Sequence, residues 1–495
     1  MTQLYKKEFQ TLFIILFFKL LILSFIPLTG DEAYFIKWGQ NLSSGYYDHP
    51  PIVGWLIYLM SYASENYIFF RLFAFFTTLT TAFVIYKIAI TYKVEKEKAL
   101  FTSLIFLISP IDILLSLMTN DVALLFFGSL GTLFLIYSLE KKEWLRDSAL
   151  AGVFLGLAFL SKYFAAFLMI SLLIFALSVY KTKAIKNVLL ITFIISLFIA
   201  QNLYFNYNSC WNNILFNFFA RTEHNSYNIK TVLTYFVLTA YIFTPWGVYY
   251  LFKARFKNSK LLKLLLSILA LAFFIFFAVS LKNKVGLHWF LLFTPFMYLL
   301  FTFTDKDTLK KLFKYNARFT YIHIAILMFA ILTPKSLLEN HKKYSDILLY
   351  TNPQEVCKVI DKMKDQRIFT FSYSSASVLN YHCKKEITVL FSKSKYGRMD
   401  DKLLDVRELS GKTITLFNKK PISEDKVKGV CKDFSSNLID IQGAKFYVAE
   451  CKKFNYELYK KNYLDYQNEK FYNIPSWLPV GKCYFKDRYY NGEKK

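Results

Sequence analysis

Residues 12–34, LFIILFFKLLILSFIPLTGDEAY, join a long apolar run directly to a glycine and two acidic residues. The run at residues 12–28 is long enough, as a helix, to cross the ~30 Å hydrocarbon core of a bilayer. Basic residues precede it, as they do in a signal peptide, but no small-residue cleavage site follows. We therefore interpret it as an uncleaved first membrane helix, with Asp31 and Glu32 at the point where the chain leaves the membrane.

Comparable apolar runs recur through residue 334 and predict a helical multi-span membrane protein. The composition agrees, because 55% of the 495 residues are hydrophobic, 53 are Phe and only 19% are charged. These values exclude a disordered chain, a coiled coil and an ordinary soluble enzyme. The runs are continuous rather than alternating, which favours helices over a β-barrel. The eleven predicted spans lie at 12–28, 67–92, 99–117, 121–138, 148–160, 164–180, 187–205, 232–252, 264–280, 287–303 and 319–334.

The distribution of basic residues predicts the orientation of the chain. Lys and Arg concentrate before residue 12 and in the alternate connections at 93–98, 141–146, 181–186, 253–263 and 306–318. Cytoplasmic loops carry such an excess, so the N-terminus is predicted to be cytoplasmic and the region from residue 335 to be outside. The net charge of +26 is explained in this way, and no nucleic-acid-binding motif accompanies it. Nucleic acid is therefore not an expected partner.

Two regions follow from this topology. Residues 1–334 form a predicted transmembrane domain with long outer loops at 29–66 and 206–231, and residues 335–495 mix short β-like runs with helical stretches, as a small α/β domain does. All six cysteines fall on the predicted outer side: Cys210, Cys357, Cys383, Cys431, Cys451 and Cys483. An oxidising compartment permits disulfides, within Cys357/Cys383 and Cys431/Cys451, but the sequence leaves free thiols equally open.

Acidic groups gather where predicted spans end on the outer side. Asp31 and Glu32 follow the first span, and Asp121 opens a later one. Carboxylates at a lipid–water boundary are suited to accept a proton or to orient an acceptor, and helix capping is the structural alternative. In the first loop, a second cluster precedes two prolines that hold the chain extended, which favours a polar site beside a lipid headgroup. It consists of Tyr46, Tyr47, Asp48 and His49.

Cationic groups also occur on the outer side, where the topology rule makes them scarce. They are Lys162, Arg221, Lys284 and the neighbouring His288. Arg offers a fork that fits phosphate oxygens, and Lys binds phosphate as a point charge. For the lysines, snorkelling to the interface is the alternative.

The sequence lacks a nucleotide-binding fingerprint. Neither G-x-G-x-x-G after a strand nor a Walker motif is present. The energy for a transfer reaction must then come from the substrate, and a polyprenyl-phosphate sugar already carries its leaving group.

The string DEAYFIKWGQNLSSGYYDHPPIVGWLI at 31–57 resembles the first outer loop of polytopic glycosyltransferases. These are the bacterial relatives of dolichyl-phosphate-mannose protein mannosyltransferases, including the lipid A aminoarabinose transferases. The resemblance continues through TND at 119–121, LSKY at 160–163, the W…F…R…EH pattern of 211–224 and K…HW…P at 284–295, and it covers about residues 1–335. It implies the membrane glycosyltransferase (GT-C) fold with about 11–13 membrane helices and a C-terminal α/β periplasmic domain.

The resemblance also assigns expected roles. Asp31 is the leading catalytic carboxylate, with Glu32 beside it and Asp121 at the second acidic position. The residues expected to bind the donor phosphate or sugar are Tyr46, Tyr47, Asp48, His49, Lys162, Arg221, Lys284 and His288. Because His49 stands where the relatives have a Lys, the cation for the phosphate is expected from Lys162, Arg221 or Lys284. Glu223 and His224 match a Glu-His pair of the relatives.

With Asp48, that pair would form a divalent-metal site as an alternative to a reaction without a cofactor. The resemblance further implies an inverting transfer of a sugar, an amino sugar, from undecaprenyl phosphate to lipid A or another envelope glycolipid. The expected location is the periplasmic face of a bacterial inner membrane. A protein O-glycosyltransferase is the alternative from the same fold. A transporter is less favoured, because the chain shows no inverted repeat and its charges lie at the boundary.

Overall fold

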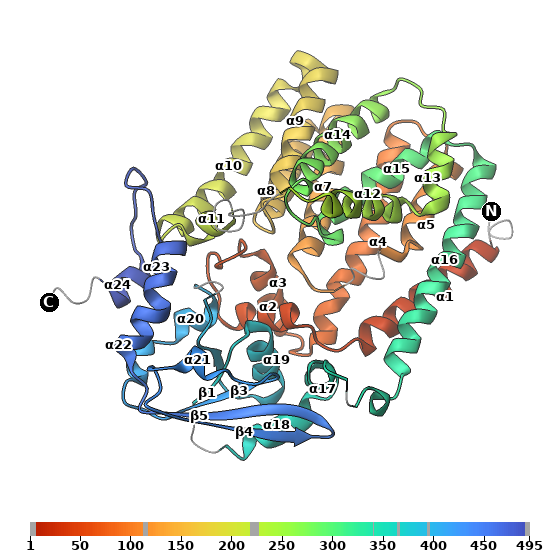
Figure 1. Cartoon of the computed structure of the whole chain (residues 1–495). Helices are drawn as coiled ribbons and strands as arrows, with labels where there is room; N and C mark the ends of the chain where they lie inside the picture. Colours follow the sequence, from red (N-terminus) through yellow and green to blue (C-terminus); the bar gives the residue numbers. More distant parts are fainter. Residues whose placement is uncertain are drawn as a thin grey trace.

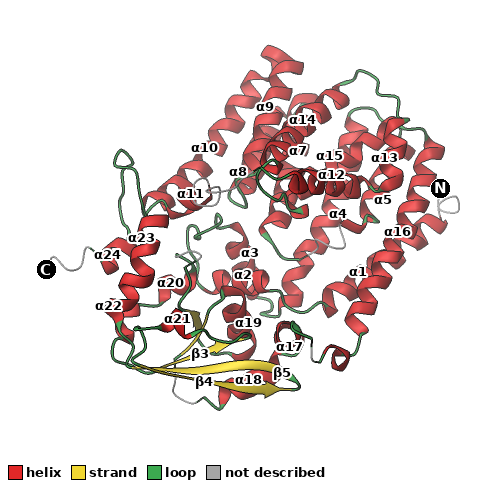
Figure 2. Ribbon diagram, viewed as in Figure 1, coloured by secondary structure: helices red, strands yellow, loops and turns green. Residues whose placement is uncertain are grey.

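The structure, a computed structural model, describes residues 6–111, 117–217, 227–339, 341–363, 367–393 and 397–490. A helical region and a mixed α/β C-terminal region lie against each other, with the first helix, α1, and the last helix, α24, on opposite sides (Figures 1 and 2). The helical region contains α1 (Lys6–Phe25), α2 (Gly30–Gln40), α3 (Ile52–Ser61), α4 (Tyr67–Thr91), α5 (Lys96–Leu107), α7 (Asn120–Glu140), α8 (Trp144–Phe159), α9 (Ala165–Tyr180), α10 (Ile185–Tyr207), α11 (Asn212–Leu215), α12 (Ile229–Phe243), α13 (Pro245–Phe252), α14 (Lys260–Ser280), α15 (Thr294–Leu299) and α16 (Lys306–Leu332).

Within the described residues, six helical stretches are long and apolar enough to cross a membrane, or seven if the bent pair α12–α13 is one span. The prediction of eleven such spans, and of about 11–13 membrane helices, is too high by this measure. The predicted spans at 99–117 and 148–160 contain α5 and α8, which have only 12 and 16 residues. The predicted pair at 164–180 and 187–205 corresponds to two helices, α9 and α10, which this measure counts as one apolar stretch, Ala165–Tyr207. The protein is nevertheless a multi-pass membrane protein.

Side-chain hydrogen bonds stabilise the junction at which α12 ends and α13 begins inside the helical bundle. α12 and α13 meet at 85°, at Thr244, whose φ is 64°. The Thr244 hydroxyl donates to Asn316 Oδ1 at 2.8 Å, and the Tyr298 hydroxyl donates to the carbonyl of Ile242 at 3.0 Å. A carbonyl freed by a broken helix has no water to bind in the membrane, so a protein donor must serve it. These polar residues therefore stabilise the bend rather than mark a second site.

The C-terminal region is built on a five-stranded sheet with the order β2-β1-β3-β5-β4. β1 (Ile368–Thr370) pairs in parallel with β2 (Ile387–Val389) and β3 (Ile414–Asn418), whereas β5 (Ala444–Lys452) pairs antiparallel with β3 and with β4 (Asp433–Ile441). Its helices are α17 (Tyr344–Thr351), α18 (Pro353–Asp361), α19 (Tyr373–Cys383), α20 (Met399–Leu403), α21 (Glu424–Val427), α22 (Tyr456–Tyr459), α23 (Asp465–Phe471) and α24 (Tyr484–Tyr489). The predicted mixture of strands and helices is confirmed.

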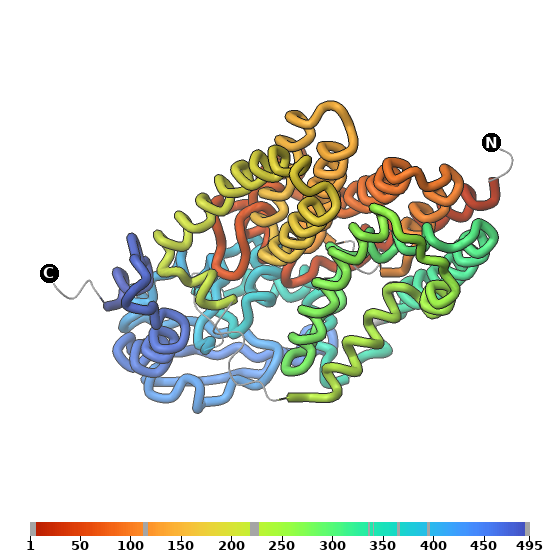
Figure 3. The backbone as a smooth tube through the Cα atoms, turned by 90° about the horizontal axis from the view of Figure 1, so that it is seen from above, coloured from red at the N-terminus to blue at the C-terminus, as the bar shows by residue number. Residues whose placement is uncertain are grey.

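Three disulfides involve all six cysteines. The sequence left Cys357–Cys383 and Cys431–Cys451 open alongside free thiols, and the structure contains both bonds, each inside the C-terminal region. The third bond, Cys210–Cys483, joins the connection after α10 to the residue before α24, 273 positions later. It therefore ties the C-terminal region covalently to the helical region. Figure 3, seen from above, shows the end of α10 beside the last, dark blue part of the chain.

Candidate active site

The first turn of α2 gives its two carboxylates different environments. Thr29 caps the helix, and its side chain and backbone exchange hydrogen bonds with Glu32 in a capping box. Glu32 is 3% exposed and receives a bidentate ion pair from Arg71 of α4, at 2.8 and 2.7 Å. Asp31, one residue earlier, is exposed. The predicted acidic pair is thus one structural carboxylate and one accessible carboxylate.

Arg71 also holds the chain that precedes α2. Its guanidinium donates to the carbonyls of Leu23, Ile26 and Pro27 at 2.6, 2.7 and 3.0 Å. The Arg71 side chain is fully buried, and its charge is matched by Glu32. A buried charge is tolerated when it is paired and its donors are used. The end of α1 and the start of α2 are therefore bound to a single side chain of α4.

Asp31 opens into a cavity of about 500 Å³ between the helical and C-terminal regions. Several elements meet there: α2, the first outer loop, the start of α7, the α8–α9 connection and α19. Of the predicted site residues, the cavity is lined by Asp31, Asp48, His49, Asp121, Lys162 and His288. The structure thus brings together six residues that the sequence distributes over more than 250 positions.

An ion pair lies in the wall of the cavity. Lys162 Nζ donates to Asp121 Oδ1 at 2.7 Å, and both side chains are nearly buried, with 10% and 12% exposure. Asp121 lies in the first turn of α7, whose N-cap is Thr119, and Lys162 lies just after α8 ends. The Lys162 ammonium is also 5.0 Å from the centre of the Phe164 ring. The pair places one cation and one anion at fixed positions facing the cavity.

The first outer loop contributes both structural and cavity-facing residues. Tyr46 stacks on Trp38 with ring centres 4.3 Å apart and donates its hydroxyl to the Trp38 carbonyl at 2.8 Å. The Tyr46 backbone N–H donates to the carbonyl of His49 at 3.0 Å, which closes a turn around Asp48. Tyr47 is buried against Phe216. Tyr46 and Tyr47 therefore shape the loop, while Asp48 and His49 face the cavity.

The C-terminal region supplies a side chain that the sequence analysis missed. The hydroxyl of Tyr373, at the start of α19, donates to Asp31 Oδ1 at 2.7 Å. Burial, together with the charge of Asp31, raises the pKa of Tyr373 well above its usual value, so the phenol keeps its proton and remains a donor. Arg398, only 3% exposed, has its guanidinium carbon 5.5 Å from the centre of the Tyr373 ring. The 342-residue separation of Tyr373 from Asp31 left no sequence signal.

Gly30 lets α19 approach the start of α2. A Cβ at this position would lie 2.3 Å from Ser374 Cβ and 3.0 Å from Ser374 Cα, which is closer than non-bonded carbons approach. Nearby, a buried ion pair joins Lys37 of α2 to Asp400 of α20. The hydroxyl of Tyr381 also accepts the Tyr67 backbone N–H at 3.1 Å. The C-terminal region is therefore fixed directly on the helix that carries Asp31.

The remaining predicted residues lie elsewhere or cannot be placed. Lys284 is exposed and does not line the cavity. Arg221, Glu223 and His224 lie outside the described residues. Among the residues that the structure describes, no three His, Cys, Asp or Glu side chains group as metal ligands. Because Asp48 is the only described member of the predicted metal site, that site stays a prediction.

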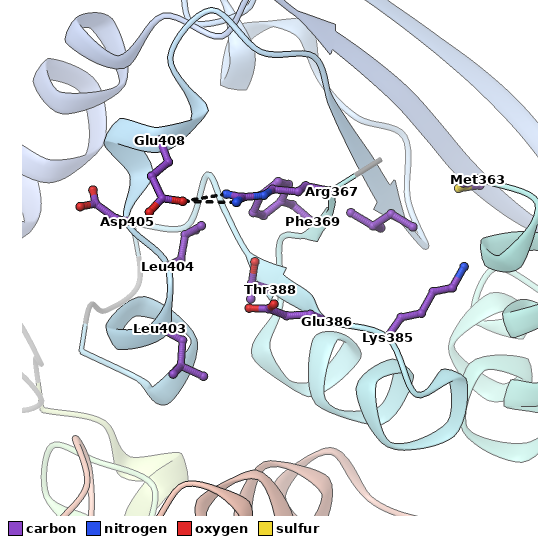
Figure 4. A pocket seen from close by; sticks show the side chains of 11 residues that line it. Met363, Arg367, Phe369, Lys385, Glu386, Thr388, Leu403, Leu404, Asp405 and Glu408 are labelled. Carbon is purple, nitrogen blue, oxygen red and sulfur yellow. Dashed lines mark hydrogen bonds and ion pairs between the residues drawn. The ribbon is translucent and has the colours of Figure 1, made fainter. Parts of the chain in front are cut away.

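A second cavity, of about 420 Å³, lies within the C-terminal region (Figure 4). Arg367 and Glu408 form an ion pair at 3.2 Å across it, and the side chain of Thr388 lies between them and Lys385 (Figure 4). None of the predicted site residues lines this cavity. Of these two cavities, only the one at Asp31 gathers described residues that the sequence predicts as site residues.

Comparison with known proteins agrees with the helical arrangement. ArnT from Cupriavidus metallidurans in the apo state superposes with a TM-score of 0.62 at 13% identity, over 89% of this chain and 97% of ArnT. The chain has the fold of ArnT. The structure of ArnT bound to undecaprenyl phosphate matches equally, with a TM-score of 0.61, 14% identity and coverage of 90% and 98%. The predicted fold class is confirmed.

Two sequence matches support the same relationship. Residues 48–205 match the family model described as dolichyl-phosphate-mannose-protein mannosyltransferase. The lipid A galacturonosyltransferase RgtD of Rhizobium johnstonii is 30% identical over 180 residues, which is 36% of this chain. That match spans 38% of the length of RgtD. The resemblance predicted from the sequence is confirmed.

Proposed function

We propose that this protein is a glycosyltransferase that moves a sugar from a polyprenyl phosphate to a glycolipid acceptor on the outer side of the membrane. The observation that carries the proposal is the single cavity that gathers Asp31, Asp121, Lys162 and His49 in a membrane protein with the ArnT fold. The ArnT structure bound to undecaprenyl phosphate and the lipid A acceptor in the name of RgtD support the donor and acceptor classes.

In the proposed reaction, an acceptor oxygen attacks the anomeric carbon of the donor sugar. The new C–O bond forms as the bond to the polyprenyl phosphate breaks, so the configuration inverts and the phosphate leaves with the electron pair. Asp31 takes the proton of a hydroxyl acceptor, or orients an acceptor that is already ionised. Tyr373 holds the Asp31 carboxylate through its 2.7 Å hydrogen bond, and so acts as a positioning residue.

Cationic side chains stabilise the negative charge that grows on the leaving phosphate. Lys162 and His49 line the cavity, and we assign this role to them. Arg221 and Lys284 stay predicted donor ligands: Arg221 lies outside the described residues, and Lys284 is exposed and four positions before the cavity residue His288 in the sequence. A divalent metal held by Asp48, Glu223 and His224 stays an alternative, and a chelator should abolish transfer only if that metal is required.

The sugar is proposed to be an amino sugar. This donor class follows from the resemblance to the aminoarabinose transferases. The carboxylate of Asp31 is exposed and lines the cavity, and it is suited to pair with a cationic sugar amine. The name of RgtD favours a different donor, galacturonic acid, whose carboxylate would instead need a cation. These two donors are separable because they add different masses to the acceptor.

Lipid A is the proposed acceptor, and the description of the matching family favours a secreted protein as the second candidate. We also propose that the N-terminus is cytoplasmic and that the cavity and the C-terminal region face the periplasm of a bacterial inner membrane. The basic residues at 141–146, 181–186, 253–263 and 306–318 support this orientation through the positive-inside rule.

The decisive experiment is mass spectrometry of lipid A from cells with the gene, without it, and with Asp31→Asn. An amino sugar predicts a pentosamine or hexosamine mass that only the intact protein adds. Tyr373→Phe should fold normally and reduce transfer about tenfold, since a hydrogen bond to a charged group contributes about 1.5–3 kcal/mol. Unchanged lipid A together with a glycosylated secreted protein would overturn the lipid acceptor, and full transfer by Asp31→Asn would overturn the proposed site.

A further inference from the structure

The connection between α23 and α24 is apolar and exposed. Residues 473–482 read NIPSWLPVGK, with no acidic residue. Trp477 is 78% exposed and Val480 is 37% exposed. In Figure 1 this dark blue loop extends away from α23, beside the end of α10. Because 78% of Trp477 is exposed, its ring contributes little to the core of the C-terminal region.

The loop is held firmly against the end of α10. The backbone N–H of Gly481 donates to the Tyr207 carbonyl at 3.0 Å, and Trp211 Nε1 donates to the Pro479 carbonyl at 2.8 Å. The Cys210–Cys483 disulfide closes the same junction. A Cβ at position 481 would lie 2.4 Å from the Tyr207 ring, so glycine permits this approach. The loop therefore has a fixed position relative to a membrane helix.

The end of α10 identifies the surroundings of the loop. α10 closes the apolar stretch Ala165–Tyr207, a candidate membrane-spanning stretch whose most apolar 18-residue window is only 17% buried inside the protein. In its last turns, Leu203 is 44% exposed, Tyr204 is 70% exposed and Tyr207 is 37% exposed. Exposed aromatic residues at the end of a span are typical of the membrane–water interface. The apolar surface of the loop continues this lipid-facing surface of α10.

We propose that loop 473–482 inserts Trp477 into the headgroup–acyl boundary of the outer leaflet and anchors the C-terminal region to the lipid surface. Trp is enriched at this depth because its ring is amphipathic. Pro475 and Pro479 have no backbone N–H to desolvate, and their fixed φ angles reduce the entropy lost on insertion. Lys482, exposed at the base of the loop, suits the phosphates of anionic lipids.

The proposed anchor would also affect the position of the cavity. The proposal depends on the location of the protein in a membrane and not on the proposed reaction. Cys210 and Trp211 precede α11, and Phe216 of the following turn lines the cavity. A loop that is fixed both to lipid and to this segment holds one wall of the cavity at the level of the outer leaflet. A substrate with a lipid tail would then meet the cavity without leaving the bilayer.

The test uses a nitroxide label in the full-length protein, reconstituted in vesicles of phosphatidylethanolamine and phosphatidylglycerol. All six cysteines are disulfide-bonded, so Trp477→Cys provides a single labelling site. Leu438→Cys is the matched control, since Leu438 is a 55% exposed apolar residue on β4 of the same region. The proposal predicts that the label at 477 collides more often with oxygen than with a water-soluble nickel chelate, and that the label at 438 shows the reverse.

Equal accessibility of both labels to the nickel chelate would overturn the proposal. Protection at 477 that grows with protein density in the vesicles would also overturn it, because that outcome indicates a second copy of the chain rather than lipid. If Trp477→Cys does not fold, the protein and its Trp477→Phe variant are compared with lipids brominated near the headgroup. The proposal predicts that brominated lipid quenches the Trp fluorescence of the protein more than that of Trp477→Phe. Equal quenching of the two proteins would contradict it.

Discussion

Replacing Gly30 by Ala should push the C-terminal region away from the helical region next to Asp31, the candidate base. The added Cβ would lie 2.3 Å from Ser374 Cβ, whereas carbon atoms in contact are about 3.5–4.0 Å apart, so α2 and α19 must move apart by about 1 Å or more. The Tyr373–Asp31 hydrogen bond of 2.7 Å would then exceed bonding distance. We expect overpacking to cost about 1–3 kcal/mol of stability. Loss of the hydrogen bond should slow transfer about tenfold or more.

The assay combines thermal unfolding with the rate of sugar transfer to lipid A. Adding Ser374→Gly removes the nearer clash and should restore part of both losses. Gly39→Ala is the matched control on the same helix, because its Cβ meets the side chain of Ile57, 2.6 Å away, and not the C-terminal region. Gly39→Ala should lower stability but should not slow sugar transfer as Gly30→Ala does. A Gly30→Ala protein with normal stability and normal transfer would refute the proposed coupling.

Three further predictions concern charge, pH and covalent linkage. Lys162→Met leaves the nearly buried Asp121 unpaired and should lower the free energy of unfolding by about 3 kcal/mol. Adding Asp121→Asn to this variant should recover most of that loss. Equal free energies of unfolding for the single and the double variant would contradict the pairing. Burial lowers the pKa of His382 to about 4. As the pH drops from about 6.5 towards 4, His382 therefore binds a proton in the unfolded chain but not in the folded one, and stability should fall. His382→Gln should flatten this part of the stability–pH curve. Replacing Cys210 and Cys483 by Ser should lower stability by about 2–4 kcal/mol and expose residues 206–217 to protease, whereas removing the disulfide between β5 and the segment before β4 should leave their cleavage unchanged.

The sequence predicted much of the cavity because topology alone brings alternate span ends together. Asp31, Asp121 and Lys162 each lie where an apolar run ends on the predicted outer side, and the structure places all three in one cavity. Local signals were sufficient here, since apolar length and loop charge are read without knowing any long-range contact. Asp48 and His49 could be placed for the same reason.

Interactions between distant segments could not be predicted. The sequence does not show that Glu32 is bound by Arg71, nor that Tyr373 reaches Asp31 from another region. The predicted number of spans exceeds the six or seven candidate spans of the described residues because apolar composition does not show that α5 and α8 are short helices. The Cys210–Cys483 bond was missed because six cysteines allow fifteen pairings.

Arg71 has a consequence for how substrates reach Asp31. The Arg71 guanidinium donates to three carbonyls at and after the end of α1 and to the carboxylate of Glu32, next to Asp31. Tyr373 of α19 donates to Asp31 in the same turn of α2. The turn that carries Asp31 is thereby held from both sides, whereas the Asp31 side chain itself is exposed. With Asp31 in its proposed role as the base, opening and closing of the cavity would involve its other walls rather than this turn.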